Sequence, residues 1–127
     1  MDQSFTVELT NRPGELARLA RALATQGIDI RQLAGGSAGN AGWAFLTTDD
    51  EAATRSVLQD LGYRYLEGRV ITVAVEDRPG ALADLSERLT RADVDIAGVM
   101  IVGHRGTLVE IALTVDDESR ARAVLGG

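Results

Sequence analysis

Hydrophobic and polar residues alternate near the start of the chain, and the same alternation returns in its middle. Every second residue of segments 5–9 and 71–75 is large and apolar, which is typical of a strand with one buried face. Segments 16–23 and 82–89 then carry residues at spacings of three and four, mostly leucine, that form one stripe along a helix. We therefore expect each strand to be followed by a helix that covers one face of a sheet.

The chain is an internal repeat. Asn-Arg-Pro-Gly at residues 11–14 recurs as Asp-Arg-Pro-Gly at residues 77–80, and 11 of the 27 residue pairs between segments 4–30 and 70–96 are identical. After a one-residue insertion the match resumes at an offset of 67. This predicts two copies of one supersecondary unit, which we place at residues 1–68 and 69–127.

Each copy predicts the same order of elements. Pro13 is expected at about the first position of the first helix, and Gly27 and Asp93 are expected to end the two first helices in the left-handed conformation. A second strand (28–34, 94–102), a hairpin turn (35–40, 103–106) and a third strand (43–48, 108–115) are expected next. A second helix then begins in an acidic cluster (49–51, 116–118), and in the first copy it directs Val57, Leu58 and Leu61 inward. A closing strand (63–67) follows in the first copy.

This order, β-α-β-β-α-β, predicts the α+β class: two ferredoxin-like units in tandem, each an antiparallel sheet with helices on one face. The second unit is expected to lack its last strand, because the sequence stops after the second helix. Strand 70–75 would then leave an apolar edge open, and Trp43 and Phe45 would lie on the face opposite Ala44 and Leu46. We therefore expect a homodimer.

Composition narrows the chemistry. All 13 basic residues are arginine and there is no cysteine, which excludes Schiff-base lysines, thiol catalysis and thiolate zinc sites. A net charge of −6 argues against nucleic acid or a membrane surface as a partner. His104 is the one histidine and falls in a hairpin, so we predict no catalytic residue, no metal ligand and no cofactor. No secretory signal or membrane-spanning run is recognised, so the expected location is the cytoplasm.

The repeated motif points to a family. The pattern [Asn/Asp]-Arg-Pro-Gly-x-Leu-Ala-x-Leu, with [Ile/Val]-Asp-Ile centred 15 residues after the glycine, resembles the ACT-domain family and covers nearly the whole chain twice. ACT domains are small-molecule sensors, usually of amino acids, that generally hold the ligand between two units. The resemblance implies a non-catalytic, amino-acid-binding regulatory protein.

The turn has chemistry that suits an amino acid. Backbone N–H groups in the first turn of a helix are unpaired donors at the positive end of the helix dipole, which favours a carboxylate. By analogy with the family, an acidic residue from the neighbouring unit would accept the ammonium group. One candidate site is therefore Asn11, Arg12, Pro13, Gly14 and Glu15 with Asp95, and the other is Asp77, Arg78, Pro79, Gly80 and Ala81 with Asp29. Because Asp77 would repel a carboxylate, the site built on Asn11 is expected to be the stronger.

Structural alternatives stay open for these residues. Asn11 and Asp77 are also suited to capping the helix start, and Arg12 and Arg78 to a solvated position in the turn. Gly14 and Gly80 are also explained if only the turn geometry requires them. Asp29 and Asp95 are also typical of ordinary surface residues at the start of a strand. Two rival functions also stay open. One is a regulatory subunit whose enzyme is a separate chain; the other is a small enzyme that uses His104 or carboxylates.

Overall fold

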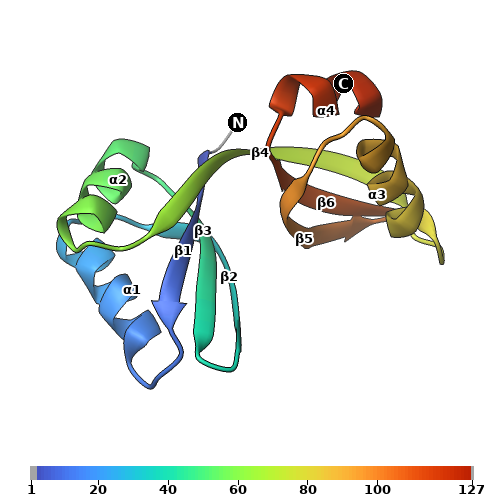
Figure 1. Cartoon of the computed structure of the whole chain (residues 1–127). Helices are drawn as coiled ribbons and strands as arrows, with labels where there is room; N and C mark the ends of the chain where they lie inside the picture. The colour runs from blue at the N-terminus through green and yellow to red at the C-terminus, as the bar shows by residue number, and fades with distance from the viewer. Residues whose placement is uncertain (1–2, 127) are drawn as a thin grey trace. The chain divides into compact units, whose positions relative to one another are not determined.

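The computed structural model describes residues 3–126 and divides into two compact units between Glu67 and Gly68. The N-terminal unit contains β1 (Gln3–Thr10), α1 (Glu15–Thr25), β2 (Ile30–Ala38), β3 (Ala41–Thr48), α2 (Glu51–Asp60) and the start of β4 (Tyr65–Glu76). The C-terminal unit contains the rest of β4, then α3 (Ala81–Arg91), β5 (Ile96–Arg105), β6 (Leu108–Val115) and α4 (Glu118–Leu125) (Figure 1). The described residues thus form the predicted α+β arrangement, in which one order of strands and helices is repeated.

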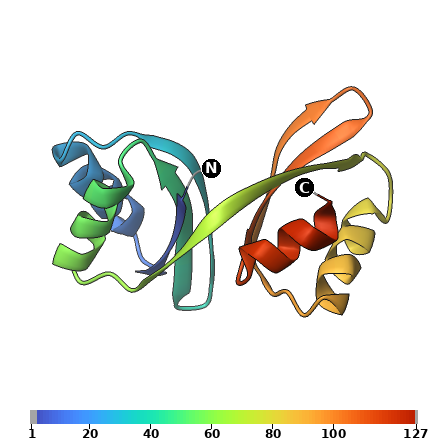
Figure 2. The ribbon, with the colours of Figure 1, turned by 90° about the horizontal axis from the view of Figure 1, so that it is seen from above.

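In the N-terminal unit the strand order is β2-β3-β1-β4, and β3 runs antiparallel to both β1 and β2. Helices α1 and α2 cover one face of this sheet, as Figures 1 and 2 show. The core lies between the two layers and follows the predicted periodicity. Its buried members are Phe5, Val7, Leu19, Leu23, Ile28, Ala44, Leu46, Val57 and Leu58.

The C-terminal unit repeats this packing. Its strand order is β4-β6-β5, with antiparallel pairing throughout, and α3 and α4 supply the helix layer. The buried core is Ile71, Leu85, Leu89, Val94, Val109, Ile111, Leu113, Val115 and Ala121. Helix α4 is the last element among residues 3–126. The absence of a closing strand from this unit stays a prediction.

Several element boundaries differ from the prediction. The hairpins turn at residues 39–40 and 106–107 only, so Gly35, Gly36 and Gly103 belong to strands rather than turns. Strand β4 runs unbroken through Gly68, where we expected a junction between two strands. Leu61 was expected to point inward but is 42% exposed, because α2 has already ended at Asp60.

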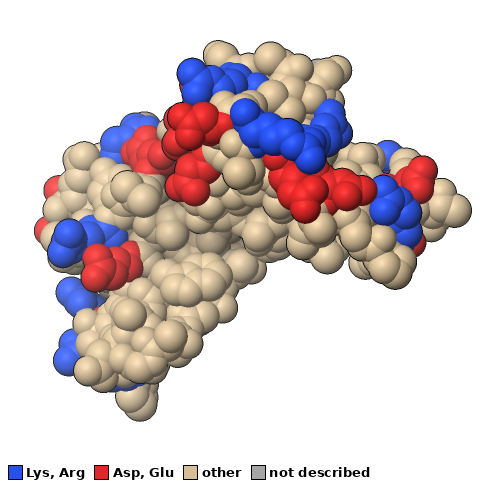
Figure 3. Space-filling model, turned by 45° about the vertical axis from the view of Figure 1, so that its right-hand side comes forward, with Lys and Arg blue, Asp and Glu red and all other residues tan. Residues whose placement is uncertain are grey.

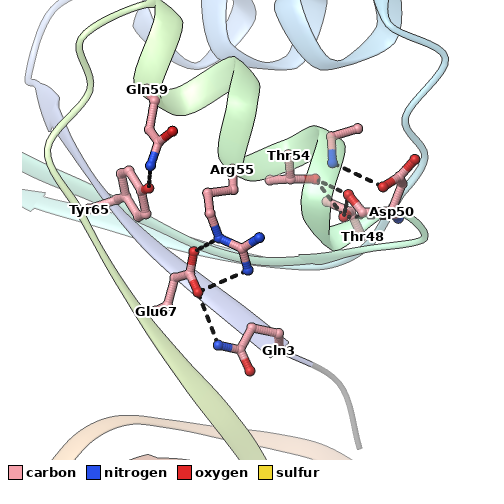
Figure 4. Close-up of polar contacts among 9 residues, drawn as sticks. Gln3, Thr48, Asp50, Thr54, Arg55, Gln59, Tyr65 and Glu67 are labelled. Carbon is pink, nitrogen blue, oxygen red and sulfur yellow. Dashed lines mark hydrogen bonds and ion pairs between the residues drawn. The ribbon is translucent and has the colours of Figure 1, made fainter.

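The predicted helix ends are largely confirmed. Gly27 and Asp93 both take the left-handed conformation, with φ of 71° and 59°. The acidic cluster caps α2, since the Asp50 carboxylate accepts a hydrogen bond from the Ala53 N–H at 2.9 Å (Figure 4). Asp117 does the same for α4. These acidic residues therefore serve the helix starts, where the helix dipole favours negative charge.

Helix α2 is also fixed to β4 by an ion pair. Arg55 donates through Nε and Nη2 to the two carboxylate oxygens of Glu67, and the Gln3 side chain donates to Glu67 at 3.1 Å (Figure 4). The hydrogen bond from Arg55 lowers the pKa of Glu67 below its ordinary value, while partial burial opposes this shift. Among residues 3–126, no helix is long and apolar enough to cross a membrane.

Candidate functional site

The loop between β1 and α1 holds the repeated Pro-Gly motif. Gly14 is the N-cap of α1 and takes φ of 91°, a left-handed conformation that favours glycine, and Gly80 does the same before α3 with φ of 89°. Pro13 therefore lies before the N-cap, and the prediction that it occupies the first helical position is wrong. Turn geometry alone explains why glycine occupies these two positions.

The first-turn donors are only partly free. The Glu15 N–H donates to the Arg12 carbonyl with 3.4 Å between N and O, and the Ala81 N–H donates to the Arg78 carbonyl at 3.2 Å. These two groups are not the unpaired donors that we expected, because the tight turn brings a carbonyl beneath each of them. The Gly14 N–H has no backbone acceptor within residues 3–126 and stays a candidate donor.

Asn11 ties this loop to the tip of the β2–β3 hairpin. Its side-chain amide donates to the Gly39 carbonyl at 2.7 Å, and its backbone N–H donates to the Asn40 carbonyl at 3.2 Å. Helix α1 has no side-chain cap, so Asn11 does not act as one. In the C-terminal unit only the backbone contact is repeated, from the Asp77 N–H to the Thr107 carbonyl at 2.9 Å. Asn11 thus fixes the loop and the hairpin to one another.

The two motif arginines have different partners. Arg12 Nε lies 3.0 Å from Glu15 Oε2, and the Glu15 side chain is only 11% exposed. Arg78 instead binds Asp84 at 2.8 Å and Glu76 at 3.3 Å, and the hydrogen bond to Asp84 raises its pKa above the ordinary value. On the face drawn in Figure 3, other arginine side chains (blue) likewise lie next to carboxylate side chains (red). Both arginines are ion-paired rather than simply solvated.

A cavity of about 320 Å³ lies between this loop, the first turn of α1 and the β2–β3 hairpin. We call it the glycine hollow, because three of its wall positions on β2 and β3 are glycine. It is lined by Leu9, Thr10, Asn11, Arg12, Glu15, Leu16, Leu33, Gly35, Gly36, Ser37, Gly42, Trp43 and Ala44. Three of the five N-terminal candidate residues, Asn11, Arg12 and Glu15, therefore come together here, whereas Pro13, Gly14 and the two aspartates do not line it.

The sheet register explains the hollow. Gly35 is paired with Ala44 and Gly42 with Leu9, so these glycines lie on the helix-facing side of the sheet, where a side chain would otherwise fill the space. On the other face, a β-carbon at Gly36 would come within 3.1 Å of Cζ2 of the Trp43 indole, which therefore lies over this glycine. The side chains of Leu16, Leu33 and Trp43 are each about half exposed around the hollow.

Larger residues hold the equivalent strand positions in the C-terminal unit. By sheet register the counterpart of Gly35 is Ile101, which pairs with Ile111, and the counterpart of Gly42 is Val109, which pairs with Val75. Val109 is buried in the core of its unit. The position of Glu15 is held by Ala81, so the carboxylate is missing as well. The features that build the hollow therefore belong to the N-terminal unit.

Asp29 and Asp95 lie away from the loops of their own units. Asp29 precedes β2 next to Asp49, whose carboxylate accepts its N–H at 2.9 Å, at the sheet end opposite the β2–β3 turn. Asp95 has the same relationship to Asp116. Within one unit, neither aspartate can meet the Pro-Gly loop. Their predicted role as ammonium acceptors from a neighbouring unit stays a prediction.

Other candidate chemistry is sparse. His104 is exposed near the end of β5. Within residues 3–126 no group of three or more His, Asp or Glu side chains is arranged to hold a metal ion. Of the two aromatic residues expected on the sheet face opposite Ala44 and Leu46, Phe45 is only 8% exposed, whereas Trp43 is 47% exposed.

The fold has known counterparts. Protein BT0572 from Bacteroides thetaiotaomicron aligns with a TM-score of 0.72 and 18% identity, covering 98% of this chain and 86% of that one. The regulatory subunit of aspartate kinase from Thermus flavus aligns with a TM-score of 0.67 and 20% identity, covering 98% and 91%. The corresponding subunit from Thermus thermophilus, in its ligand-free form, gives a TM-score of 0.64 and 16% identity, covering 98% and 89%.

These aspartate kinase subunits are ACT-domain proteins. The chain has an ACT-like fold. This confirms the resemblance that the repeated motif indicated, and at these identities it establishes the fold alone. No family model matches the chain, and no curated protein sequence matches it significantly.

Proposed function

We propose that this ACT-like protein is a non-catalytic regulator that binds a free amino acid in the glycine hollow. The observation that carries the proposal is the combination of apolar walls with one ion pair at one cavity. A small-molecule site is typically concave and mostly apolar, with a few polar groups that orient the ligand. Leu9, Leu16 and Leu33 offer the apolar surface, and Arg12 and Glu15 offer one charge of each sign.

A free amino acid has one carboxylate and one ammonium group, which complement the one arginine and the one carboxylate of the hollow. Its carboxylate would bind the terminal nitrogens of Arg12, because Arg12 uses only Nε toward Glu15. Its ammonium would bind the Glu15 carboxylate, and its side chain would rest against the leucines. A volume of about 320 Å³ suits a small or branched apolar amino acid. Val109 and Ala81 stand in the C-terminal unit where the hollow has Gly42 and Glu15, which supports one such site per chain rather than two.

Thermal unfolding in the presence of each of the twenty amino acids tests this proposal. A ligand at 100 times its dissociation constant adds about 2.7 kcal/mol to the free energy of unfolding. For a chain of this size the melting temperature should rise by several degrees, and we expect this from at least one small or branched amino acid. If none of the twenty raises it, and calorimetry detects no binding, the protein is not an amino-acid sensor.

A second candidate is a regulatory subunit of a separate enzyme of amino-acid metabolism. It is favoured by the fold likeness to regulatory subunits of aspartate kinase, which extends over 98% of this chain. Purification of the tagged full chain from its native host distinguishes the two. A stoichiometric enzyme that stays bound, and whose activity changes with the amino acid, supports the subunit. A self-contained sensor would bind the amino acid with no enzyme attached.

A further inference from the structure

A second cavity of the N-terminal unit is polar and rich in arginine. It also has a volume of about 320 Å³, and it shares Leu9, Thr10, Arg12 and Glu15 with the glycine hollow. We call it the arginine cavity. Its lining comes from β1, the β1–α1 loop, α1, the β2–β3 turn and the loop between α2 and β4. The charged lining residues are Glu8, Arg12, Glu15, Arg18 and Arg64.

The charges in this cavity do not balance. Three guanidinium groups face two carboxylates, so the cavity carries one net positive charge at neutral pH, although the chain as a whole has a net charge of −6. Arg12 is paired with Glu15 at 3.0 Å, and Arg64 is paired loosely with Glu8 at 3.6 Å. The excess charge therefore resides on Arg18.

Arg18 has no acidic partner within residues 3–126. Its guanidinium carbon lies 5.5 Å from the centre of the Tyr63 ring, a cation–π contact that leaves its N–H donors available. The repeat shows that this position can be neutralised, because its counterpart is Asp84, which pairs with the motif arginine Arg78 at 2.8 Å. The N-terminal unit thus has an arginine where the other unit has an internal counter-ion.

Tyr63 forms one wall of the arginine cavity. Its ring is the part that Arg18 contacts, and the residue also packs against the core of the unit. This contact holds the Arg18 guanidinium at the cavity without neutralising its charge.

We propose that the arginine cavity binds a small oxyanion, either free phosphate or the phosphoryl group of a small phosphate monoester. Arg18 and the terminal nitrogens of Arg12 would hold its oxygens, with Arg64 at the rim. Guanidinium groups match phosphate oxygens in geometry and charge. This site lies beside the proposed amino-acid site and takes a different class of ligand.

Isothermal calorimetry of the full chain tests this proposal, with inorganic phosphate in one arm and glycerol 3-phosphate in the other. Both are measured against sodium chloride of matched ionic strength. We expect saturable binding in at least one arm. Tighter binding of phosphate identifies the free anion as the ligand, and tighter binding of the monoester identifies a phosphorylated metabolite.

Arg18→Gln should weaken this binding at least tenfold, since it removes a charge-assisted contact. Arg21→Gln is the matched control, because Arg21 lies on the same helix but does not line the cavity. Arg18 does not line the glycine hollow either, so Arg18→Gln should keep its response to amino acids. Absence of binding in both arms, or equal weakening by both substitutions, would overturn the anion site while leaving the amino-acid test unaffected.

Discussion

Arg12 and Glu15 form an ion pair across the first turn of α1, with 3.0 Å between Nε and Oε2, and both residues line both cavities of the N-terminal unit. A ligand in either cavity that draws Arg12 toward its own anion must compete with Glu15. The two proposed sites are therefore expected to be thermodynamically linked, and linkage of binding is reciprocal. Any change that phosphate makes in the affinity for the amino acid must equal the change that the amino acid makes in the affinity for phosphate.

Replacement of Arg12 should abolish most of the response to the amino acid. Arg12→Gln removes the proposed carboxylate partner, a charge-assisted hydrogen bond worth about 1.5–3 kcal/mol, so affinity should fall about ten- to a hundredfold. Arg78→Gln is the matched control, since Arg78 holds the same motif position but is paired with Asp84. Calorimetric titration of both variants measures the difference. Equal losses in the two would mean that Arg12 has no special role.

The ammonium partner can be identified by a pair of substitutions. Glu15→Gln keeps the shape of the side chain and removes its charge, and Asp95→Ala tests the acceptor expected from the family resemblance. If Glu15 holds the ammonium, Glu15→Gln should lower affinity at least tenfold while Asp95→Ala leaves it unchanged. The reverse result would return the role to Asp95. Circular dichroism should show that Asp95→Ala is folded, because Asp95 contacts Asp116 only through its backbone groups and the Asp116 carboxylate. The same measurement checks that Glu15→Gln, which keeps the shape of the side chain, is folded.

Filling the glycine hollow should prevent binding without removing any charge. Ser37 lines the hollow and is exposed, so Ser37→Leu adds an apolar side chain there without displacing a buried group. Ser37→Ala serves as the control because it removes the hydroxyl and adds no volume. We expect the leucine variant to lose the ligand-induced rise in melting temperature and the alanine variant to retain most of it. A leucine variant that responds like the wild type would place the ligand elsewhere.

The fold was predictable because it depends on patterns that repeat. Hydrophobic residues alternate with period two in segments 5–9 and 71–75, and the duplicated Arg-Pro-Gly aligns the sequences of the two copies. The boundary between the two units was harder to predict. Gly68 resembles a linker in the sequence, whereas in the structure it lies inside the continuous strand β4. Glycine in a strand gives no signal in a hydrophobic pattern.

The same limit hid the candidate site. A hollow is built from missing side chains, and Gly35 and Gly42 carry none, so the run of glycines was interpreted as a turn. A position-by-position comparison of the two copies would have indicated these glycines. Ile101 and Val109 occupy the equivalent places in the second copy, which identifies the two glycines as a difference between units that are otherwise alike. Asn11 was placed in the loop from the sequence, but its bond to Gly39 required the hairpin register.

The assembly of the chain can be measured directly. Val99, Ile101 and Val102 on β5 are 53%, 58% and 38% exposed, so one strand carries three accessible apolar side chains. Apolar edge strands favour pairing with another chain. We expect light scattering at micromolar concentration to give twice the monomer mass of 13.5 kDa. A mass that stays at 13.5 kDa, with and without the amino acid, would show that the homodimer prediction is wrong.

The ion pair between Arg55 and Glu67 should make stability depend on pH in the acid range. The hydrogen bond from Arg55 lowers the pKa of Glu67 in the folded protein, so the folded state binds a proton at this carboxylate less readily than the unfolded state does. The stabilisation is therefore complete above the unfolded pKa, about 4.3, and is lost as the pH falls through the lower folded value.

Glu67→Gln removes this contribution. The pair is partly exposed, so the substitution should lower the free energy of unfolding by about 1 kcal/mol or less at neutral pH. The difference between wild type and variant should shrink as the pH falls below about 4.3, because the wild-type carboxylate then becomes protonated. Urea unfolding at neutral pH and at a series of acid pH values measures this difference. Glu8→Gln is the control, since Glu8 and Arg64 are 3.6 Å apart and largely exposed, and it should change stability less. A difference for Glu67→Gln that stays constant or grows in acid would contradict the role assigned to this pair.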